Sequence, residues 1–226
     1  MRPFAELLEE ARGGHGSFHE DSHPPTVIRR QFSRAMYELA SEIAGIAPAE
    51  LRAVETMALP FSSAQLDEGV PLENEYLRLE HVEAVRSPTG DRVRVTAVPP
   101  RSRYGDIQFP AVWFDGARLF LVGGADAPGL WRPYSELRIE YIPAPPELAP
   151  TEDGDEIDWN PPLERMAERY LIAQMHTFMA TRRPEEIPRP TLERILGTED
   201  RLREGYLLAV LDRDGVTVDQ VREVWP

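Results

Sequence analysis

The apolar residues of the first 58 positions recur with the spacing of α-helices. In FAELLEEAR, the apolar positions 4, 7, 8 and 11 share one helical face, and Gly13-Gly14 ends the pattern. TVIRRQFSRAMYELASEIAGI, residues 26–46, repeats this periodicity over a longer distance. We therefore expect two amphipathic helices in an N-terminal segment, 1–58, with a further helical turn or two between Pro48 and Met57.

Between residues 59 and 146 the apolar period changes to two, which is typical of half-buried strands. DRVRVTAV and LRIEYI alternate in this way, and AVWFDGARLFLVG contains two strand patterns around Asp115-Gly116, a dipeptide that favours a hairpin turn. Together with YLRLEHVEAV, these stretches predict about five short strands. We expect an inserted β module at 59–146, built as a small antiparallel barrel or sandwich.

The helical period returns after the β module. PAPPELAPTEDGDEID contains four prolines and six acidic residues that no basic residue interrupts, which favours an extended, solvated segment. Pro161-Pro162 suits a helix start, and the pattern predicts helices up to about Asp214-Gly215. We assign 147–215 to an acidic linker and C-terminal helices that pack with 1–58, and 216–226 to an extended C-terminal tail. The predicted fold class is therefore α+β, a helical bundle with an inserted β module.

The composition of the 226 residues excludes several classes of function. There is no cysteine, so disulfides, thiolate zinc sites and cysteine nucleophiles are excluded. A net charge of −14 argues against a protein whose affinity depends on neutralising phosphates. The N-terminal acids interrupt any signal-peptide pattern, and no stretch has the length of a membrane span, so we expect a soluble protein without a membrane partner.

All 25 basic residues are arginines. The planar guanidinium group pairs with carboxylates through two hydrogen bonds and tolerates desolvation better than the lysine ammonium group does. Arginine therefore suits contacts between subunits. A genome that favours arginine codons would explain the same bias.

The most suggestive catalytic pattern is HEDSH, residues 19–23, which matches the H-E-x-x-H motif of zinc hydrolases. In such a site His19 and His23 would bind zinc from one helical face, and Glu20 would act as the base. However, the intervening Asp and Ser are poor helix formers and two prolines follow at once, which opposes the helix that the site needs. We interpret the stretch as an exposed polar loop. Zinc hydrolysis, or adventitious metal binding that includes His15, is the alternative.

No other catalytic signature survives inspection of its context. DRDG at 212–215 lacks acidic residues at both ends of a calcium loop, VGGADAPG departs from G-x-G-x-x-G, and G-x-S-x-G is absent. We therefore predict that the protein is not an enzyme and has no cofactor. Val221, Val224 and Trp225 of the tail are candidate partner-interface residues, because tryptophan is enriched among interface anchors. A tail folded back on its own subunit is the alternative.

Several stretches together resemble the head–tail connector adaptor proteins of tailed bacteriophages. They are FAELLEEAR followed by a polar loop and VIRRQFSRAMYELA, YSELRIEYIPAPPEL at the end of the β insertion, an acidic spacer, and IDWNPPLERMAERYLIAQM before a last helix and tail. The resemblance spans nearly the whole chain. It implies a structural virion protein, assembled in the host cytoplasm, that forms a ring, typically a dodecamer, beneath the portal protein.

The resemblance also implies the partners of the protein. These would be the portal protein, which the C-terminal segment would reach, the next neck or tail protein, and further copies in the ring. Double-stranded DNA would pass through the ring channel without sequence-specific binding, and the acidic charge fits a channel to which DNA does not adhere. Another neck or tail-completion ring protein is the alternative within this class.

Overall fold

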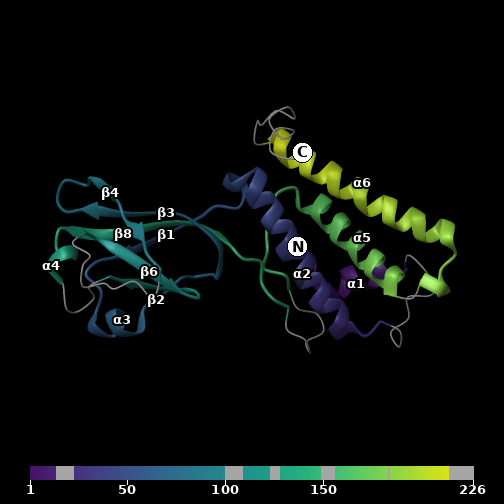
Figure 1. Cartoon of the computed structure of the whole chain (residues 1–226), viewed down its shortest axis with the longest axis horizontal. Coiled ribbons are helices and arrows are strands. Elements are labelled where there is room, and N and C mark those ends of the chain that lie inside the picture. The colour runs from purple at the N-terminus through teal and green to yellow at the C-terminus, as the bar shows by residue number, and fades with distance from the viewer. Residues whose placement is uncertain (14–22, 100–108, 123–127, 149–155, 183, 214–226) are drawn as a thin grey trace. The chain divides into compact units, whose positions relative to one another are not determined.

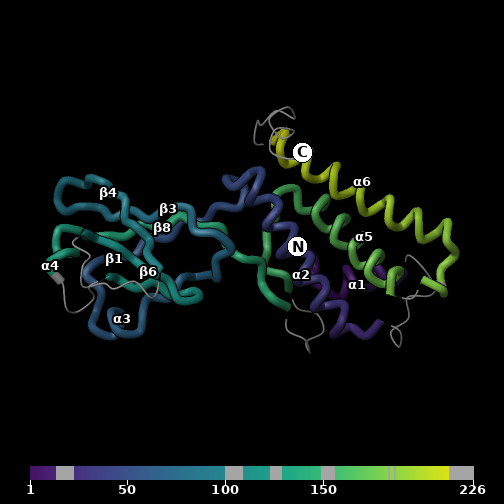
Figure 2. The backbone as a smooth tube through the Cα atoms, in the orientation of Figure 1, coloured from purple at the N-terminus to yellow at the C-terminus, as the bar shows by residue number. Residues whose placement is uncertain are grey.

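The chain forms two compact units, one helical and one built of strands. The computed structural model describes residues 1–13, 23–99, 109–122, 128–148, 156–182 and 184–213 (Figure 1). Met1–Leu51 and Pro145–Pro226 together make the helical unit, and Arg52–Ala144 make the β unit. Figure 2 follows the backbone through both units. The predicted α+β fold class, with a β module inserted into a helical bundle, is confirmed.

The helical unit is assembled from both parts of the chain. Helix α5 packs against α1, α2 and α6, and so lies at the centre of the unit (Figure 1). Its elements are α1 (Phe4–Gly13), α2 (Pro25–Ile46), the 3-10 turn η1 (Pro48–Glu50), α5 (Glu164–Arg182), the 3-10 turn η3 (Pro184–Glu186) and α6 (Arg189–Arg213). None of the helices in the described part of the chain is long and apolar enough to cross a membrane.

The predicted apolar faces of α1 and α2 are buried. All four apolar positions of α1 are inaccessible, and the rings of Phe4 and Phe32 meet edge to face at 5.4 Å. The guanidinium carbon of Arg29, a residue that is also buried, lies 4.8 Å from the centroid of the Phe4 ring, in the position of a cation–π contact. Apolar burial and this contact hold α1 on α2.

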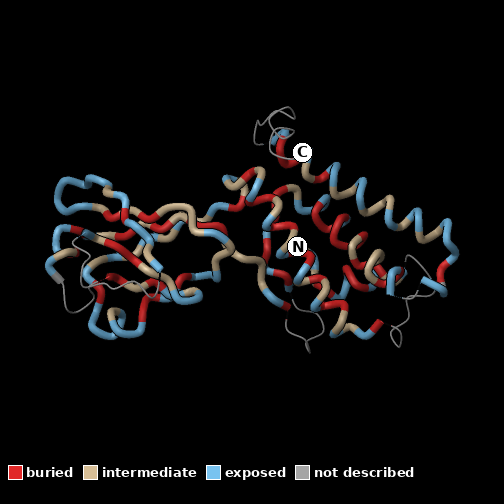
Figure 3. Tube along the Cα trace, in the orientation of Figure 1, coloured by how far each residue is buried: buried red, intermediate tan, exposed pale blue. Residues whose placement is uncertain are grey.

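Helix α6 is attached at its C-terminal half. Its buried residues are Tyr206, Val210 and Leu211, whereas its first turns are half-buried or exposed (Figure 3). The Tyr206 hydroxyl donates a hydrogen bond to the Pro162 carbonyl oxygen at 2.9 Å. Arg203 donates from Nε to both carboxylate oxygens of Glu42 at 3.2 Å, which links α6 to α2. These bonds orient α6 along α5.

The β unit contains two four-stranded sheets that share one core. Sheet A has the order β1 (Ala53–Ala58), β8 (Tyr134–Pro143), β3 (Tyr76–Arg86), β4 (Arg92–Arg94), and sheet B has the order β2 (Val70–Pro71), β7 (Arg118–Leu121), β6 (Ala111–Asp115), β5 (Thr96–Ala97). Two short helices, α3 (Ser63–Glu68) and α4 (Pro128–Trp131), lie outside the sheets. All strand pairs are antiparallel except β5 and β6, which are parallel.

The register of sheet A buries one side of its two central strands. Ala84 pairs with Leu137 and Val82 pairs with Ile139, and all four side chains are almost fully inaccessible. These residues join the core formed with the inner positions of sheet B, such as Leu119. In these two central strands the period-two pattern of the sequence marks the buried face. DRVRVTAV, by contrast, divides into β4 of sheet A and β5 of sheet B, and both residues of β5 are exposed.

The segment before the β module corrects one expectation. After η1, the chain forms edge strand β1 rather than the predicted helical turns up to Met57, so the β unit begins at Arg52 instead of residue 59. β1 pairs with β8 from Ala53 opposite Tyr141 onward. Inside this edge, the Glu55 carboxylate accepts hydrogen bonds from the Tyr141 hydroxyl and from the Glu73 backbone N–H at 2.8 Å. Because Glu55 is charged, it interrupts the alternation of apolar and polar residues that would otherwise predict a strand here.

Two glycines predict opposite effects of adding a methyl group. At Gly205, on the exposed side of α6, a Cβ would meet nothing within 4 Å, so Gly205→Ala should raise the free energy of unfolding by about 0.5–1 kcal/mol. At Gly69, φ is +76° and a Cβ would lie 2.6 Å from the Phe120 ring, which is stacked on Trp113 at 4.1 Å. Gly69→Ala should therefore lower the free energy of unfolding by about 2 kcal/mol. Urea unfolding of both variants checks the signs; equal effects would contradict the packing described.

The buried Tyr141 predicts a loss of stability at alkaline pH. Burial, and then the hydrogen bond to Glu55, raise the pKa of Tyr141 to about 12. Because the folded pKa lies above the ordinary value of about 10, the contribution of Tyr141 is complete below about pH 10 and is lost as the pH rises through 12. Urea unfolding at several pH values should show this decline. The decline should be shallower in Tyr141→Phe, whereas an unchanged slope would contradict the assignment.

Candidate functional site

The predicted metal pattern falls largely outside the described residues. His15, His19 and Glu20 lie there, as do the predicted interface residues Val221, Val224 and Trp225 of the tail. No group of three or more histidine, aspartate or glutamate side chains within the described ranges could hold a metal ion.

His23 is described, and it corrects one expectation about the loop. The residue is 1% exposed, so the interpretation of HEDSH as an exposed loop is wrong at this position. Arg12 donates a hydrogen bond from Nη2 to the His23 carbonyl oxygen at 3.0 Å, which ties this backbone to α1. His23 lies in a bend before α2, and the extended Pro24 (ψ 138°) follows it. The second ligand of the pattern is therefore not on a helix.

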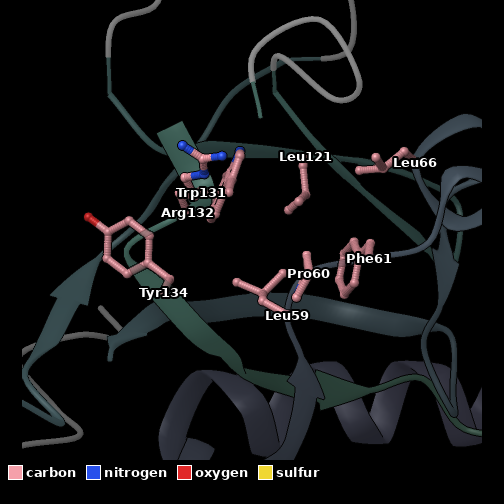
Figure 4. Close-up of a pocket in the computed structure, with 8 residues that line it drawn as sticks. All are labelled: Leu59, Pro60, Phe61, Leu66, Leu121, Trp131, Arg132 and Tyr134. Atoms are coloured by element: carbon pink, nitrogen blue, oxygen red, sulfur yellow. The ribbon is translucent and has the colours of Figure 1, made fainter. Parts of the chain in front are cut away.

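A concave pocket lies in the β unit. Its volume is about 360 Å³, within the range of pockets that bind small molecules or side chains. Figure 4 shows the side chains around it, which come from four separate parts of the chain. The lining residues are Leu59, Pro60, Phe61, Leu66, Leu121, Trp131, Arg132 and Tyr134.

Local sequence explains how these segments reach the pocket. Residues 59–61 follow β1, and the Leu59–Pro60 peptide is cis. The next segment, α3, has Ser62 as its N-cap residue. The Ser62 hydroxyl oxygen accepts a hydrogen bond from the Gln65 N–H, and the Gln65 side-chain oxygen accepts one from the Ser62 N–H. This capping box starts the helix that carries Leu66. Leu121 ends β7, and α4 leads directly into β8.

Trp131 is fixed at the pocket wall by a hydrogen bond. Its indole Nε1–H donates to the Val122 carbonyl oxygen at 3.1 Å, and the indole ring contacts the Tyr134 ring edge to face at 6.1 Å. The guanidinium carbon of Arg86 lies 5.9 Å from the centroid of the Tyr134 ring. Both aromatic residues are buried, so this wall is part of the core as well as the surface of a pocket.

Arg132 supplies the charge of the pocket. It is exposed, and it makes no hydrogen bond or ion pair within the part of the chain that the structure describes. The other described lining residues are apolar or aromatic, and none of them is an aspartate, glutamate or histidine. The pocket therefore suits binding of an apolar side chain or ring beside an anionic group, and its described lining offers no carboxylate or imidazole for proton transfer.

Sequence reasoning did not find this pocket. Nothing in the sequence pattern joins Trp131 to Phe61 or Leu66, which lie more than sixty residues away along the chain. Trp159, which lies next to the acidic linker in the sequence, is buried in the helical unit and is not part of the pocket.

The comparisons with known proteins add no family to this description. No family model matches the chain, and no curated protein matches it. The resemblance to connector adaptors therefore rests on the stretches quoted above and on the order of the elements.

Substitution of Trp131 and of Arg132 distinguishes the pocket residue that stabilises the fold from the one that is available for binding. Trp131→Ala removes a buried ring and its hydrogen bond, and should lower the free energy of unfolding by about 3–5 kcal/mol. Arg132→Ala removes an exposed side chain and should change it by less than about 0.5 kcal/mol. Urea unfolding measures both. A large loss in Arg132→Ala would show that Arg132 serves the fold instead of being available for binding.

Proposed function

We propose that the protein is a head–tail connector adaptor, a structural virion protein that forms a ring beneath the portal protein of a tailed bacteriophage. The observation that carries this proposal is the insertion of a complete β unit, Arg52–Ala144, into a helical unit made from both flanking segments. The resemblance in sequence implies this same organisation. It extends over both helical segments and the end of the insertion.

Two separate cores suit a protein that joins two assemblies. Each unit buries its own apolar residues, so each can present a contact surface without depending on the other for stability. The β unit carries the pocket with Arg132, a surface suited to contact with a protein partner such as the next neck protein. The tail, residues 216–226, follows the last helix of the helical unit in the sequence, and we propose its residues Val221, Val224 and Trp225 as portal contacts.

The charge of the chain fits the proposed channel. With a net charge of −14, the ring would repel the phosphates of DNA, and double-stranded DNA would slide through it without adhering. This property separates an adaptor from a DNA-packaging or DNA-binding protein. Tight retention of double-stranded DNA by the ring at physiological salt would contradict the proposal.

Co-expression with the portal protein of the same phage tests the proposed function. We expect the full chain to co-purify with the portal, and native mass spectrometry to show several copies of the chain in one complex. Removal of residues 216–226 should weaken this association and leave the urea unfolding of the chain unchanged. Co-purification with tail proteins in place of the portal would favour the alternative tail-completion ring, and a chain that joins neither would contradict both.

A further inference from the structure

A charged cleft lies beside the first turns of α5, within the helical unit. Its volume is about 440 Å³, and it contains no apolar lining residue. The residues that line it come from the N-terminus, α1 and α5. They are Arg2, Glu10, Glu164, Arg165, Glu168 and Arg169.

The three carboxylates of this cleft already have cationic partners. The N-terminal amine of Met1 lies 2.8 Å from Glu164 Oε1. Arg2 donates from Nη1 to Glu10 at 2.9 Å, from Nε to Glu168 at 3.0 Å, and from its backbone N–H to Glu168 at 2.8 Å. Glu168 is buried, so these bonds hold one wall of the cleft in place.

Arg165 and Arg169 are the cations that remain. Both are exposed, and neither makes an ion pair or hydrogen bond with any residue in the described ranges. They lie four residues apart on α5, so their side chains occupy the same face one turn from each other. The cleft therefore has four cations, counting the Met1 amine, against three carboxylates, and it is locally positive on a chain of net charge −14.

The surroundings of the two arginines favour carboxylates of a protein segment over a nucleic acid. Two guanidinium groups a helical turn apart can each pair with one carboxylate through parallel hydrogen bonds. A phosphate backbone needs a longer positive surface to bind with useful affinity. Here Glu10 and Glu164 are about half exposed beside the arginines and would repel a continuous row of phosphates.

The helical unit itself carries a segment with matching charge. The interval from Glu147 to Asp158 contains six acidic residues and no basic one. Of these, Glu147, Glu156 and Asp158 are described, exposed and without an ion pair among the described residues. Each copy of the chain therefore presents uncompensated carboxylates just before α5 and uncompensated guanidinium groups on α5.

We propose that Arg165 and Arg169 of one copy bind Glu156 and Asp158 of a second copy. This inference rests on the proposed ring and names one contact within it. In the proposed ring this contact runs one way from copy to copy, and such head-to-tail contacts close into a ring when the rotation between copies allows it; the reciprocal use of both surfaces by two copies would give a closed dimer instead. Exposed arginine–carboxylate pairs also supply orientation and salt-dependent association more than strength.

Cross-linking between singly substituted chains tests this contact. The chain has no cysteine, so Met166→Cys and Asn160→Cys, both at exposed positions beside the proposed charges, introduce one thiol each. Mixed full-length chains under mild oxidation should give several-fold more of the mixed disulfide dimer than a control mixture of Met166→Cys with the exposed Ser41→Cys. The excess should disappear near 1 M salt, where the Debye length is about 3 Å.

Charge exchange distinguishes the proposed pairs from chance proximity. Arg165→Glu with Arg169→Glu in the Met166→Cys chain should abolish the excess, and Glu156→Arg with Asp158→Arg in the Asn160→Cys chain should restore it. A yield equal to the Ser41 control at all concentrations, or one that the exchanges leave unchanged, would overturn the proposal. So would a closed dimer as the largest species, or binding of double-stranded DNA that the two arginine substitutions remove.

Failure of this contact and failure of the proposed function give different results. If the chain with Arg165→Glu and Arg169→Glu still co-purifies with the portal as a complete ring, the contact is wrong and the connector function stands. If chains that carry only the two cysteine substitutions show the charge-dependent cross-link but the full chain never joins a portal, the contact stands and the connector function is wrong.

Discussion

The helical unit depends on α5, which is the shared partner of helices from both parts of the chain. α1 and α2 each carry one apolar face, and two amphipathic helices alone do not enclose a core without a further element packed on that face. α5 supplies that element, and its first turn also binds the N-terminus through the two bonds from Arg2 to Glu168. The Pro162 carbonyl oxygen, just before α5, accepts the bond from Tyr206 that places α6.

The two units carry concave surfaces of different chemistry. The pocket of the β unit is apolar, with Arg132 beside buried aromatic rings, whereas the cleft of the helical unit is lined by charged side chains alone. Apolar pockets anchor a partner by excluding water, and charged clefts orient it and respond to salt. In the ring that we propose, the apolar pocket would hold a neighbouring protein and the charged cleft would orient successive copies.

Elements with a regular apolar period could be predicted from the sequence, and elements shaped by tertiary contacts could not. The 3.6-residue period located α1, α2, α5 and α6, and the period of two located the central strands of the β unit. β1 was missed because Glu55 stands on its inner side, where only the fold reveals the Tyr141 hydroxyl that binds it. The pocket was missed because its wall joins four distant segments of the chain. That Arg165 lacks an ion-pair partner among the described residues could not be predicted either, because it depends on the pairing of Glu164 with the Met1 amine and of Glu168 with Arg2.

The position of the insertion has a consequence for synthesis on the ribosome. The β unit is complete in sequence when Ala144 has been made, and its first and last strands, β1 and β8, pair with each other. Domains fold as units while the chain grows, so this unit can close early. α1 and α2 leave the ribosome first, yet they wait for α5 to supply their core. The inserted β unit can therefore fold before the helical unit, whose surfaces form only after α5 has been synthesised.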